Sequence, residues 1–183
     1  MNYYNHANSV LEELKNSLLS IDDSDLEQLI DCILSSPRVF CDGKGRSGLQ
    51  VNAFAMRLAQ MGRVSYVVSE TTTPSISKDD VLIISSGSGE TPSLVEHAKK
   101  ASEVGAKIAL ITTDTDSTIR SMSDYAVAID SFSKMSKSDQ SMQPMGTLFE
   151  QTVGLLFDIM VLLIMQKQSI TNDDMYRLHN NLE

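Results

Sequence analysis

The chain has 183 residues, of which 42% are apolar and 21% are charged, and its 24 acidic residues against 15 Lys and Arg give a formal net charge of −9. This length and composition are typical of one globular domain and exclude a disordered or collagen-like chain. The negative charge argues against nucleic-acid and anionic-membrane partners, because such contacts need clustered Lys and Arg.

Two amphipathic helices are expected within residues 1–36. Leucines and isoleucines recur at helical spacing in residues 11–19 and again in residues 26–34. Ser24 is a candidate N-cap of the second helix, with Glu27 at the capping-box spacing. Pro37 then ends that helix.

The cysteines and the termini indicate a cytoplasmic protein. Cys32 and Cys41 form neither a disulfide framework nor a zinc-ligand pattern, so we expect them to be reduced and buried. The first twenty residues lack the basic start and apolar core of a secretory signal. The apolar stretch Val153–Met165 is shorter than the roughly 20 residues that cross a bilayer, which favours a buried helix.

Beyond residue 37, short apolar runs alternate with helical patterns. The expected strands are Arg38–Cys41, Val64–Val68, Val81–Ser85, Lys107–Thr112 and Tyr125–Ile129, and the expected helices between them are Gly48–Met61, Ser93–Val104 and Ser117–Met122. Several runs are continuously apolar and are separated by crossover-length segments, as parallel strands covered on both faces are. The pattern predicts an α/β fold in three layers with five parallel strands.

The last third of the chain is expected to be helical after a polar loop at Ser131–Gln143. A long apolar helix is expected from Gly146 to Lys167 and a short one from Asn172 to Asn180. Because Ile159–Met165 is apolar on every face, we expect part of the long helix to pack against another subunit.

A glycine-rich loop, Asp42–Gly48, follows the first strand. Its Gly43, Gly45 and Gly48 satisfy the pattern GxGxxG, and Glu70 lies about 20 residues further on, where a dinucleotide fold keeps its ribose-binding acid. An NAD site is therefore one interpretation of this loop.

A second loop, Ser85–Pro92, favours a phosphate monoester instead. Glycines allow close approach, N–H groups at a helix start point outward, and the helix dipole attracts an anion. The hydroxyl donors would be Ser86, Ser88 and Thr91, joined by Ser47 and aided by Arg46 of the first loop. The bland alternative is that both loops are tight turns with N-caps. The Walker pattern is absent, which disfavours nucleotide hydrolysis.

Glu150 is the candidate general base. It lies near the start of the long helix, where a carboxylate is also stabilised by the helix dipole, so a purely structural first-turn acid is the alternative. Isomerisation next to a carbonyl needs one group that removes and returns a proton through an enediol.

His97, beside two lysines, is expected to be solvated, and no metal-binding pattern is present. The polar segment Thr71–Pro74 after the second strand, with Thr72, could line the pocket from the same sheet edge, and a plain loop is the alternative.

Four motifs in this order, GKGRSG, ETTTP, SSGSGET and QPMGTLFEQ, together with the terminal HNNLE, resemble the sugar isomerase (SIS) domain and, within it, the 6-phospho-3-hexuloisomerase family. The resemblance covers nearly the whole chain, residues 1–183, as a single domain. It implies a flavodoxin-like five-stranded sheet, no metal or organic cofactor, and a homotetramer. The implied reaction interconverts D-arabino-hex-3-ulose 6-phosphate and fructose 6-phosphate, in formaldehyde fixation by the ribulose monophosphate route.

Carried over to this sequence, the resemblance implies a role for each matching residue. The phosphate ligands would be Ser47, Ser86, Ser88 and Thr91, the pocket would include Gly45, Arg46, Gly87 and Thr72, and the catalytic residues would be Glu150 and His179. His179 would serve the site of a neighbouring subunit. The sequence departs from the family pattern at Lys44, where a small residue is usual, and at Leu178, where an Arg that touches the His is usual. The alternatives are a phosphosugar-binding sensor without catalysis and, through Glu70, a dinucleotide oxidoreductase.

Overall fold

The computed structural model describes residues 2–130 and 141–182. In chain order the elements are α1 (Tyr3–Leu19), α2 (Asp23–Ser35), β1 (Val39–Gly43), α3 (Gly45–Gln60), β2 (Ser65–Val67), β3 (Val81–Ser85), α4 (Pro92–Val104), β4 (Lys107–Thr112), α5 (Thr118–Met122), β5 (Tyr125–Ala128), α6 (Thr147–Gln168) and α7 (Asn172–Arg177). The expected polar loop at Ser131–Gln143 lies outside the described residues except for its last three.

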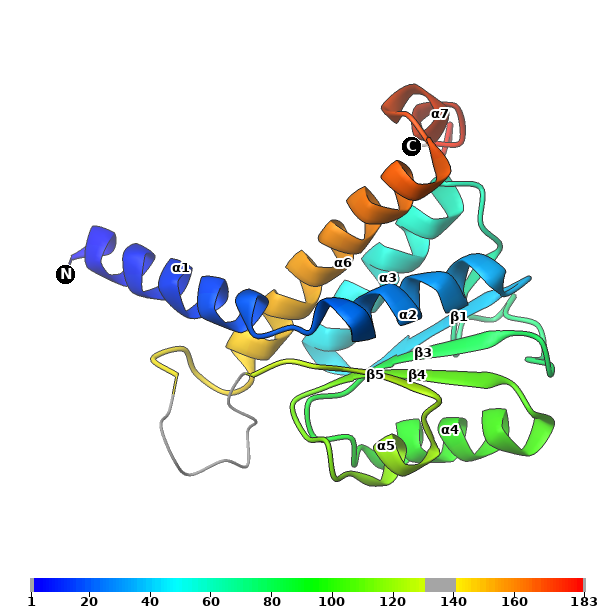
Figure 1. Cartoon of the computed structure of the whole chain (residues 1–183), viewed down its shortest axis with the longest axis horizontal. Coiled ribbons are helices and arrows are strands. Elements are labelled where there is room, and N and C mark those ends of the chain that lie inside the picture. The colour runs from blue at the N-terminus through cyan, green and yellow to red at the C-terminus, as the bar shows by residue number, and fades with distance from the viewer. Residues whose placement is uncertain (1, 131–140, 183) are drawn as a thin grey trace.

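The sheet has the predicted five parallel strands, and their order is β2-β1-β3-β4-β5 (Figure 1). The chain passes from β1 outward to β2 and returns on the other side of β1 as β3, so the strand order reverses between β1 and β3. Gly43 at the end of β1 lies opposite Ser85 at the end of β3. In an open parallel sheet, ligands bind beyond the carboxyl ends of the strands at such a reversal.

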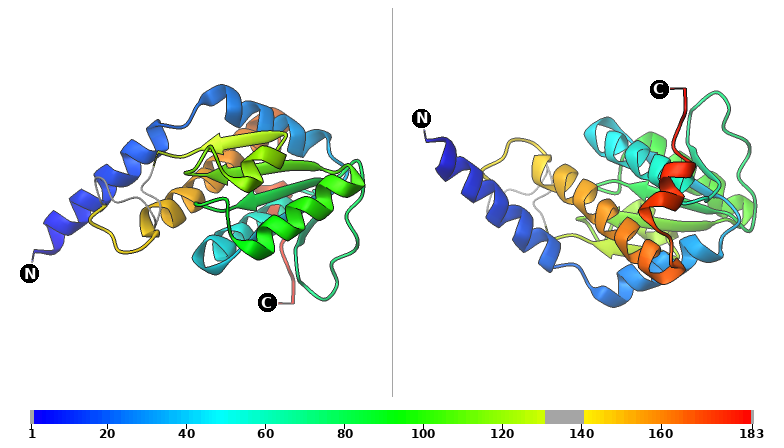
Figure 2. Two further views of the ribbon diagram at one scale, coloured as in Figure 1. Left: turned by 90° about the horizontal axis from the view of Figure 1, so that it is seen from below. Right: turned by 90° about the horizontal axis from the view of Figure 1, so that it is seen from above.

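Helices cover both faces of the sheet and make the predicted three layers. Figures 1 and 2 show α2, α3 and α6 on one face and α4 with α5 on the other. Each face has its own apolar core, and alternate residues of β1 contribute to both: Val39 and Cys41 face α3 and α6, while Phe40 faces α4. Cys32 and Cys41 are free and buried, as expected. Burial raises the pKa of the Cys41 thiol to about 12, so this thiol is protonated and inert.

The long apolar helix α6 packs directly on α3. Phe54 of α3 and Phe157 of α6 stack with ring centroids 4.3 Å apart. Gly154 allows the close approach, because a Cβ there would lie 2.6 Å from the Oε1 atom of Gln50. By length and composition α6 is apolar enough to cross a membrane, but more than half of its apolar stretch is buried inside the fold, as in the core helix of a soluble protein.

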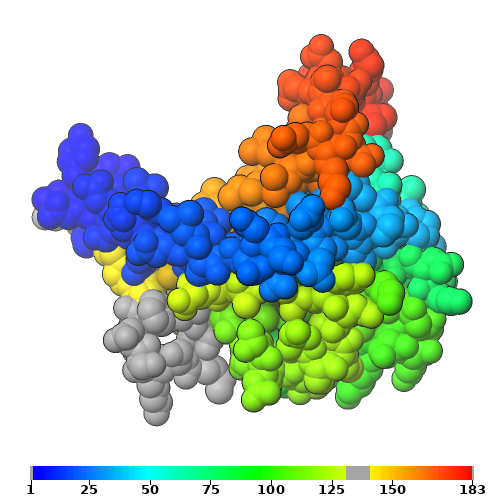
Figure 3. All heavy atoms as spheres, viewed as in Figure 1, coloured from blue at the N-terminus to red at the C-terminus, as the bar shows by residue number. Residues whose placement is uncertain are grey.

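The first two helices differ from each other in their packing. Helix α2 lies beside β5, whereas α1 packs along α6 and extends beyond the sheet (Figures 1 and 3). The N-cap of α2 is Asp22 and not Ser24 as predicted: the Oδ1 atom of Asp22 accepts hydrogen bonds from the N–H groups of Ser24 and Asp25. Asp22 directly precedes the first helical residue, so its carboxylate reaches these donors, whereas Ser24 already lies inside the helix.

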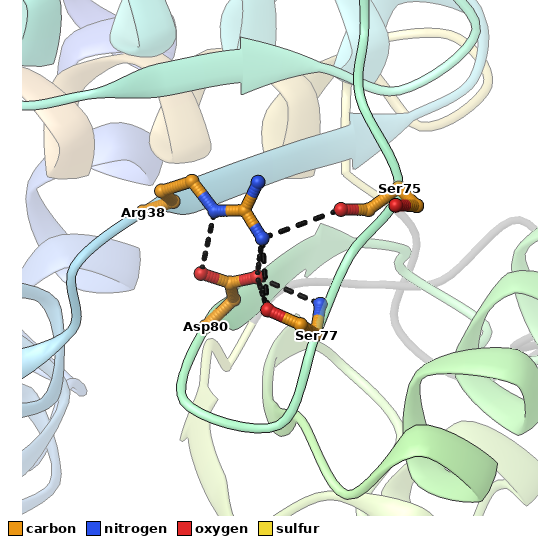
Figure 4. Close-up of polar contacts among 4 residues, drawn as sticks. All are labelled: Arg38, Ser75, Ser77 and Asp80. Carbon is orange, nitrogen blue, oxygen red and sulfur yellow. Dashed lines mark hydrogen bonds and ion pairs between the residues drawn. The ribbon is translucent and has the colours of Figure 1, made fainter.

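No helix forms in residues 68–80, which connect β2 to β3 and are all described. Instead a polar cluster holds this connection against the start of β1 (Figure 4). The guanidinium of Arg38 donates to both carboxylate oxygens of Asp80, over 2.9 and 2.6 Å, and also contacts Ser75 and Ser77. Asp80 is fully buried. The pair therefore replaces the packing that a crossover helix would provide.

Candidate functional site

The first turn leads from β1 into α3, which begins at Gly45, three residues earlier than predicted. Gly45 has a φ of +60°, and a Cβ on Gly48 would lie 2.7 Å from the carbonyl oxygen of Gly43, so the backbone closes on itself here. The N–H groups of Gly45, Arg46 and Ser47 consequently lie in the first helical turn, where donors lack intrahelical partners and the helix dipole favours an anion.

The second turn leads from β3 into α4. The N–H of Gly89 donates to the hydroxyl oxygen of Ser86 over 3.2 Å, and the N–H of Glu90 donates to that of Ser88 over 3.3 Å. These bonds fix the oxygens and leave both hydroxyl hydrogens able to donate to a ligand. Thr91 is the N-cap of α4 without using its side chain for capping, and Pro92 occupies the first turn as predicted. The segment is thus a tight turn before a helix, and the hydroxyl groups of Ser86, Ser88 and Thr91 can still donate to a ligand.

Helix α6 brings the candidate base to both turns. Glu150 is 5% exposed, and its Oε2 atom lies 2.8 Å from the Nε atom of Arg46 in the first turn. A Cβ on Gly87 in the second turn would lie 3.3 Å from the ring of Phe149, so α6 packs closely on that turn as well. The two turns end neighbouring strands, and the buried acid lies beside them. This arrangement can hold an anion at one end of a small molecule and offer a carboxylate to the other end.

The structure does not bring His179 to this group within one chain. Thr72 is exposed in the connection that follows β2, the strand next to β1, and its place in the pocket stays a prediction. His179 follows α7, and the part of α6 between Glu150 and Gln168 alone spans about 27 Å. The Nδ1 atom of His179 lies 3.0 Å from the carbonyl oxygen of Asn180, and its ring stacks on Tyr176.

A buried acid, Asp42, with two partly exposed partners near the first turn was not predicted. Asp42 is 1% exposed, and its carboxylate lies 2.6 Å from the Nδ1 atom of His97 and 3.3 Å from the Nζ atom of Lys44. His97 is solvated only in part, with 35% of its side chain exposed, because α4 lays this side chain against the end of β1. The ammonium of Lys44 is directed to Asp42, so the unusual Lys44 of the first loop has a structural partner. A lone acid in the apolar run of β1 was the signal in the sequence.

A dinucleotide site is disfavoured by the topology. The strand order found here is the flavodoxin-like one and differs from the order of dinucleotide-binding folds, in which the sheet extends through two mononucleotide halves. Glu70, the candidate ribose-binding acid, is exposed at the end of β2. Within residues 2–130 and 141–182 there is no group of three or more His, Cys, Asp or Glu side chains that could hold a metal ion.

Comparison with known proteins places this arrangement in a family. The SIS domain family matches residues 32–153, which include both turns and Glu150. The chain belongs to the SIS domain family. A Bacillus subtilis SIS domain relative named 3-hexulose-6-phosphate isomerase is 40% identical over 176 residues, 95% of each chain. A Mycobacterium gastri relative with the same name is 33% identical over 180 residues, covering 98% of this chain and 90% of the relative.

A solved structure extends the comparison to three dimensions. A Methanococcus jannaschii protein, for which the function of 3-hexulose-6-phosphate isomerase was inferred, superposes with a TM-score of 0.82 at 36% identity, covering 97% of this chain and 96% of that one. The family predicted from the four motifs is confirmed, and with it the fold.

Proposed function

We propose that the protein is a 3-hexulose-6-phosphate isomerase, which interconverts D-arabino-hex-3-ulose 6-phosphate and fructose 6-phosphate. Relatives bearing this name align over nearly the whole chain, which supports an isomerase rather than a binding module. One structural observation carries the proposal furthest. A buried carboxylate, Glu150, pairs with Arg46 of the first turn, and the same helix packs on the second turn through Phe149, at the reversal of strand order.

The phosphate end of the substrate would lie between the two turns. Ser47 lies in the first turn of α3, and Ser86, Ser88 and Thr91 precede α4, so the ligand would face two helix N-termini and four hydroxyl groups. Hydroxyls, main-chain N–H groups and helix dipoles bind an anion without a lysine. This explains how a chain with a net charge of −9 can bind a phosphosugar, since distant surface charges are screened beyond about 8–10 Å.

Glu150 would act as the general base. It would remove the proton from C2 of the 3-ketose to give a C2–C3 enediol and return it to C3. A second proton would pass from the C2 hydroxyl to the C3 oxygen, so that the carbonyl moves from C3 to C2. The ion pair with Arg46 holds the carboxylate in one orientation. With the substrate against Glu150, the guanidinium of Arg46 would lie near the enediol oxygens, where a fixed positive group lowers the barrier as negative charge develops.

The proposed enzyme is a homotetramer. This assembly would bring His179 of one subunit to the site of another, where it would assist ring opening or proton transfer. The exposed apolar residues on α6 support an interface. The reaction would belong to formaldehyde fixation by the ribulose monophosphate route in the cytoplasm, with no cofactor.

The test is an assay of purified protein with both hexulose 6-phosphates and no added metal. We expect interconversion, and Glu150→Gln should lower kcat by about 10²–10⁴-fold with little change in the affinity for inorganic phosphate. Glu96→Gln, an equal change of charge on the exposed face of α4, is the matched control and should leave kcat unchanged. A folded wild type that is stabilised by fructose 6-phosphate but converts neither sugar would identify a sensor instead.

A further inference from the structure

Helix α1 has one half-buried face, and that face includes a carboxylate. Its partly or fully buried positions recur at helical spacing as Ala7, Val10, Glu13, Leu14, Ser17 and Leu18. This face packs along α6. A Glu on the packed side of a helix that has few buried residues needs specific partners, because burying an unpaired carboxylate is costly.

Glu13 finds these partners in the chain that leads into α6. Its Oε2 atom accepts hydrogen bonds from the hydroxyl of Ser141 over 2.7 Å and from the Nε2 atom of Gln143 over 3.1 Å. Its Oε1 atom accepts from the N–H of Met142 over 2.8 Å. Burial by itself would raise the pKa of Glu13, but these three donors outweigh it and hold the pKa below its usual value. The charged carboxylate of Glu13 therefore forms hydrogen bonds with three consecutive residues, 141–143.

These residues lie directly before the turn that starts α6. The carbonyl oxygen of Pro144 accepts from both the N–H and the hydroxyl of Thr147, and the carbonyl oxygen of Gly146 accepts from the N–H of Glu150. Met145 has a φ of +61°, so the backbone turns sharply between residues 141–143 and the helix. The position of Glu150 is thus linked through one short turn to Glu13, which is more than a hundred residues away in the sequence.

The same helix also holds the chain at the end of β5. The hydroxyl of Ser17 donates to the carbonyl oxygen of Asp130, and the hydroxyl oxygen of Ser20 accepts from the N–H of Asp130, each over 3.0 Å. Helix α1 therefore contacts the chain at residue 130 and again at residues 141–143. These contacts give α1, which extends beyond the sheet, a structural connection to the candidate site.

We propose that Glu13 is a positioning residue for the isomerisation: by holding residues 141–143 it fixes the start of α6 and so the placement of the Glu150 carboxylate against the substrate. The inference rests on the proposed role of Glu150 as the base. A displacement of about 1 Å at a reacting group can cost on the order of 10²-fold in rate. Loss of the Glu13 contacts should therefore lower kcat while the phosphate turns, which do not touch Glu13, keep their affinity.

The experiment compares Glu13→Gln, Glu13→Ala and the control Glu12→Gln. Glu12 is the adjacent acid on the exposed side of α1, where its weak contact is with Lys15 at 3.9 Å. We expect kcat to fall about tenfold for both Glu13 variants, with KM and the inhibition constant of inorganic phosphate within about twofold of the wild type. Glu12→Gln should not change kcat.

If Glu13→Ala fails to fold, a double variant that exchanges the side chains of Glu13 and Gln143 still tests the proposal. Gln143→Glu alone places a second carboxylate against that of Glu13 and should lower kcat, and adding Glu13→Gln restores a donor–acceptor pair between the two positions. The double variant should recover kcat to within about threefold of the wild type. A merely structural role would change the melting temperature without this recovery of kcat.

The outcomes separate the two proposals. A wild type without isomerase activity overturns both the function and the positioning role. An active wild type whose kcat is unchanged in Glu13→Gln overturns the positioning role alone, as does a kcat lowered equally by Glu12→Gln. A lowered kcat that the double variant restores supports it.

Discussion

Arg38 and Asp80 show how one ion pair can organise a whole connection. Asp80 is fully buried and accepts from Arg38, from the N–H of Ser77 and from the hydroxyl of Ser77. Burial would raise the pKa of Asp80, but these hydrogen bonds outweigh it and lower the pKa below the ordinary 3.8. The charged form is therefore favoured by folding.

This gives a prediction for Arg38→Ala. Removing one partner of a buried pair leaves an uncompensated charge, so we expect the free energy of unfolding at pH 7 to fall by about 3 kcal/mol. Because the folded pKa is lowered, the contribution of Asp80 is complete above pH 3.8 and is lost as the pH falls through the lower folded value. Urea denaturation at pH 7 and at pH 3 measures both effects.

The control is Lys99→Ala, which removes an exposed pair with Glu96 and should have no measurable effect. The destabilisation by Arg38→Ala should shrink on going from pH 7 to pH 3. An equal destabilisation at both values of pH would contradict the assignment.

At the same scale, the sequence identified the chemistry of single residues better than their partners. The hydroxyls of the two turns and Glu150 could be named because loop, helix start and residue type occur together in the sequence. The contact between His97 and Asp42 could not, because it joins the middle of α4 to the end of β1 across 55 positions. The same holds for Glu13, whose partners are Ser141 and Gln143.

At the scale of elements, the hydrophobic pattern predicted the strands and the order of helices and strands. Where the observed ends of helices and strands differ from the predicted ends, they differ by one to three residues. The most important difference is at α3, which begins at Gly45, a residue in a left-handed conformation, and not at Gly48. Helix α1 was predicted from its leucines, yet Leu11 and Leu19 are exposed in the single chain. Periodicity indicates that a face is apolar but not what covers it.

The glycines of the two turns give an element-scale prediction. Gly45 and Gly89 both have a φ of +60°, but a Cβ on Gly89 would lie 2.0 Å from the hydroxyl oxygen of Ser117, whereas nothing lies within 4 Å of one on Gly45. Gly45→Ala should cost about 1 kcal/mol of unfolding free energy from backbone strain alone. Gly89→Ala should cost a further 1–3 kcal/mol, roughly, from overpacking against the start of α5.

Chemical denaturation of the two variants side by side measures the difference. Each variant serves as the other's control for backbone strain, since they share the same φ. Equal destabilisation of Gly45→Ala and Gly89→Ala would contradict the close packing of the second turn on α5.

At the scale of the whole molecule, helix α6 exposes an apolar stripe on the surface of the single chain. Leu155, Ile159, Leu162 and Leu163 form one stripe on α6, with exposed fractions from 36% to 65%. Exposed apolar stripes of this kind mark protein–protein contacts. The proposed tetramer would cover this stripe and could bring His179 to a neighbouring site, which the distance along α6 prevents within one chain.

Leu162→Glu should therefore reduce assembly, because it places a charge in the apolar stripe. Analytical ultracentrifugation should find the wild type as a multiple of the 20.1 kDa chain and the variant shifted to smaller species. Lys99→Glu, on the opposite layer of the molecule, should not change assembly. A wild type that sediments as a monomer would rule out the tetramer and the role of His179 across subunits.

The central claim is that two turns hold the phosphate while an acid from α6 reaches the carbon that reacts. A crystal structure of the Glu150→Gln variant with fructose 6-phosphate tests it most directly. We predict the phosphate within hydrogen-bond distance, about 3 Å, of the hydroxyls of Ser47, Ser86, Ser88 and Thr91. The side chain at position 150 should lie about 3–3.5 Å from C2 or C3. A phosphate bound away from both turns, or a sugar whose C2 and C3 face away from position 150, would contradict the account.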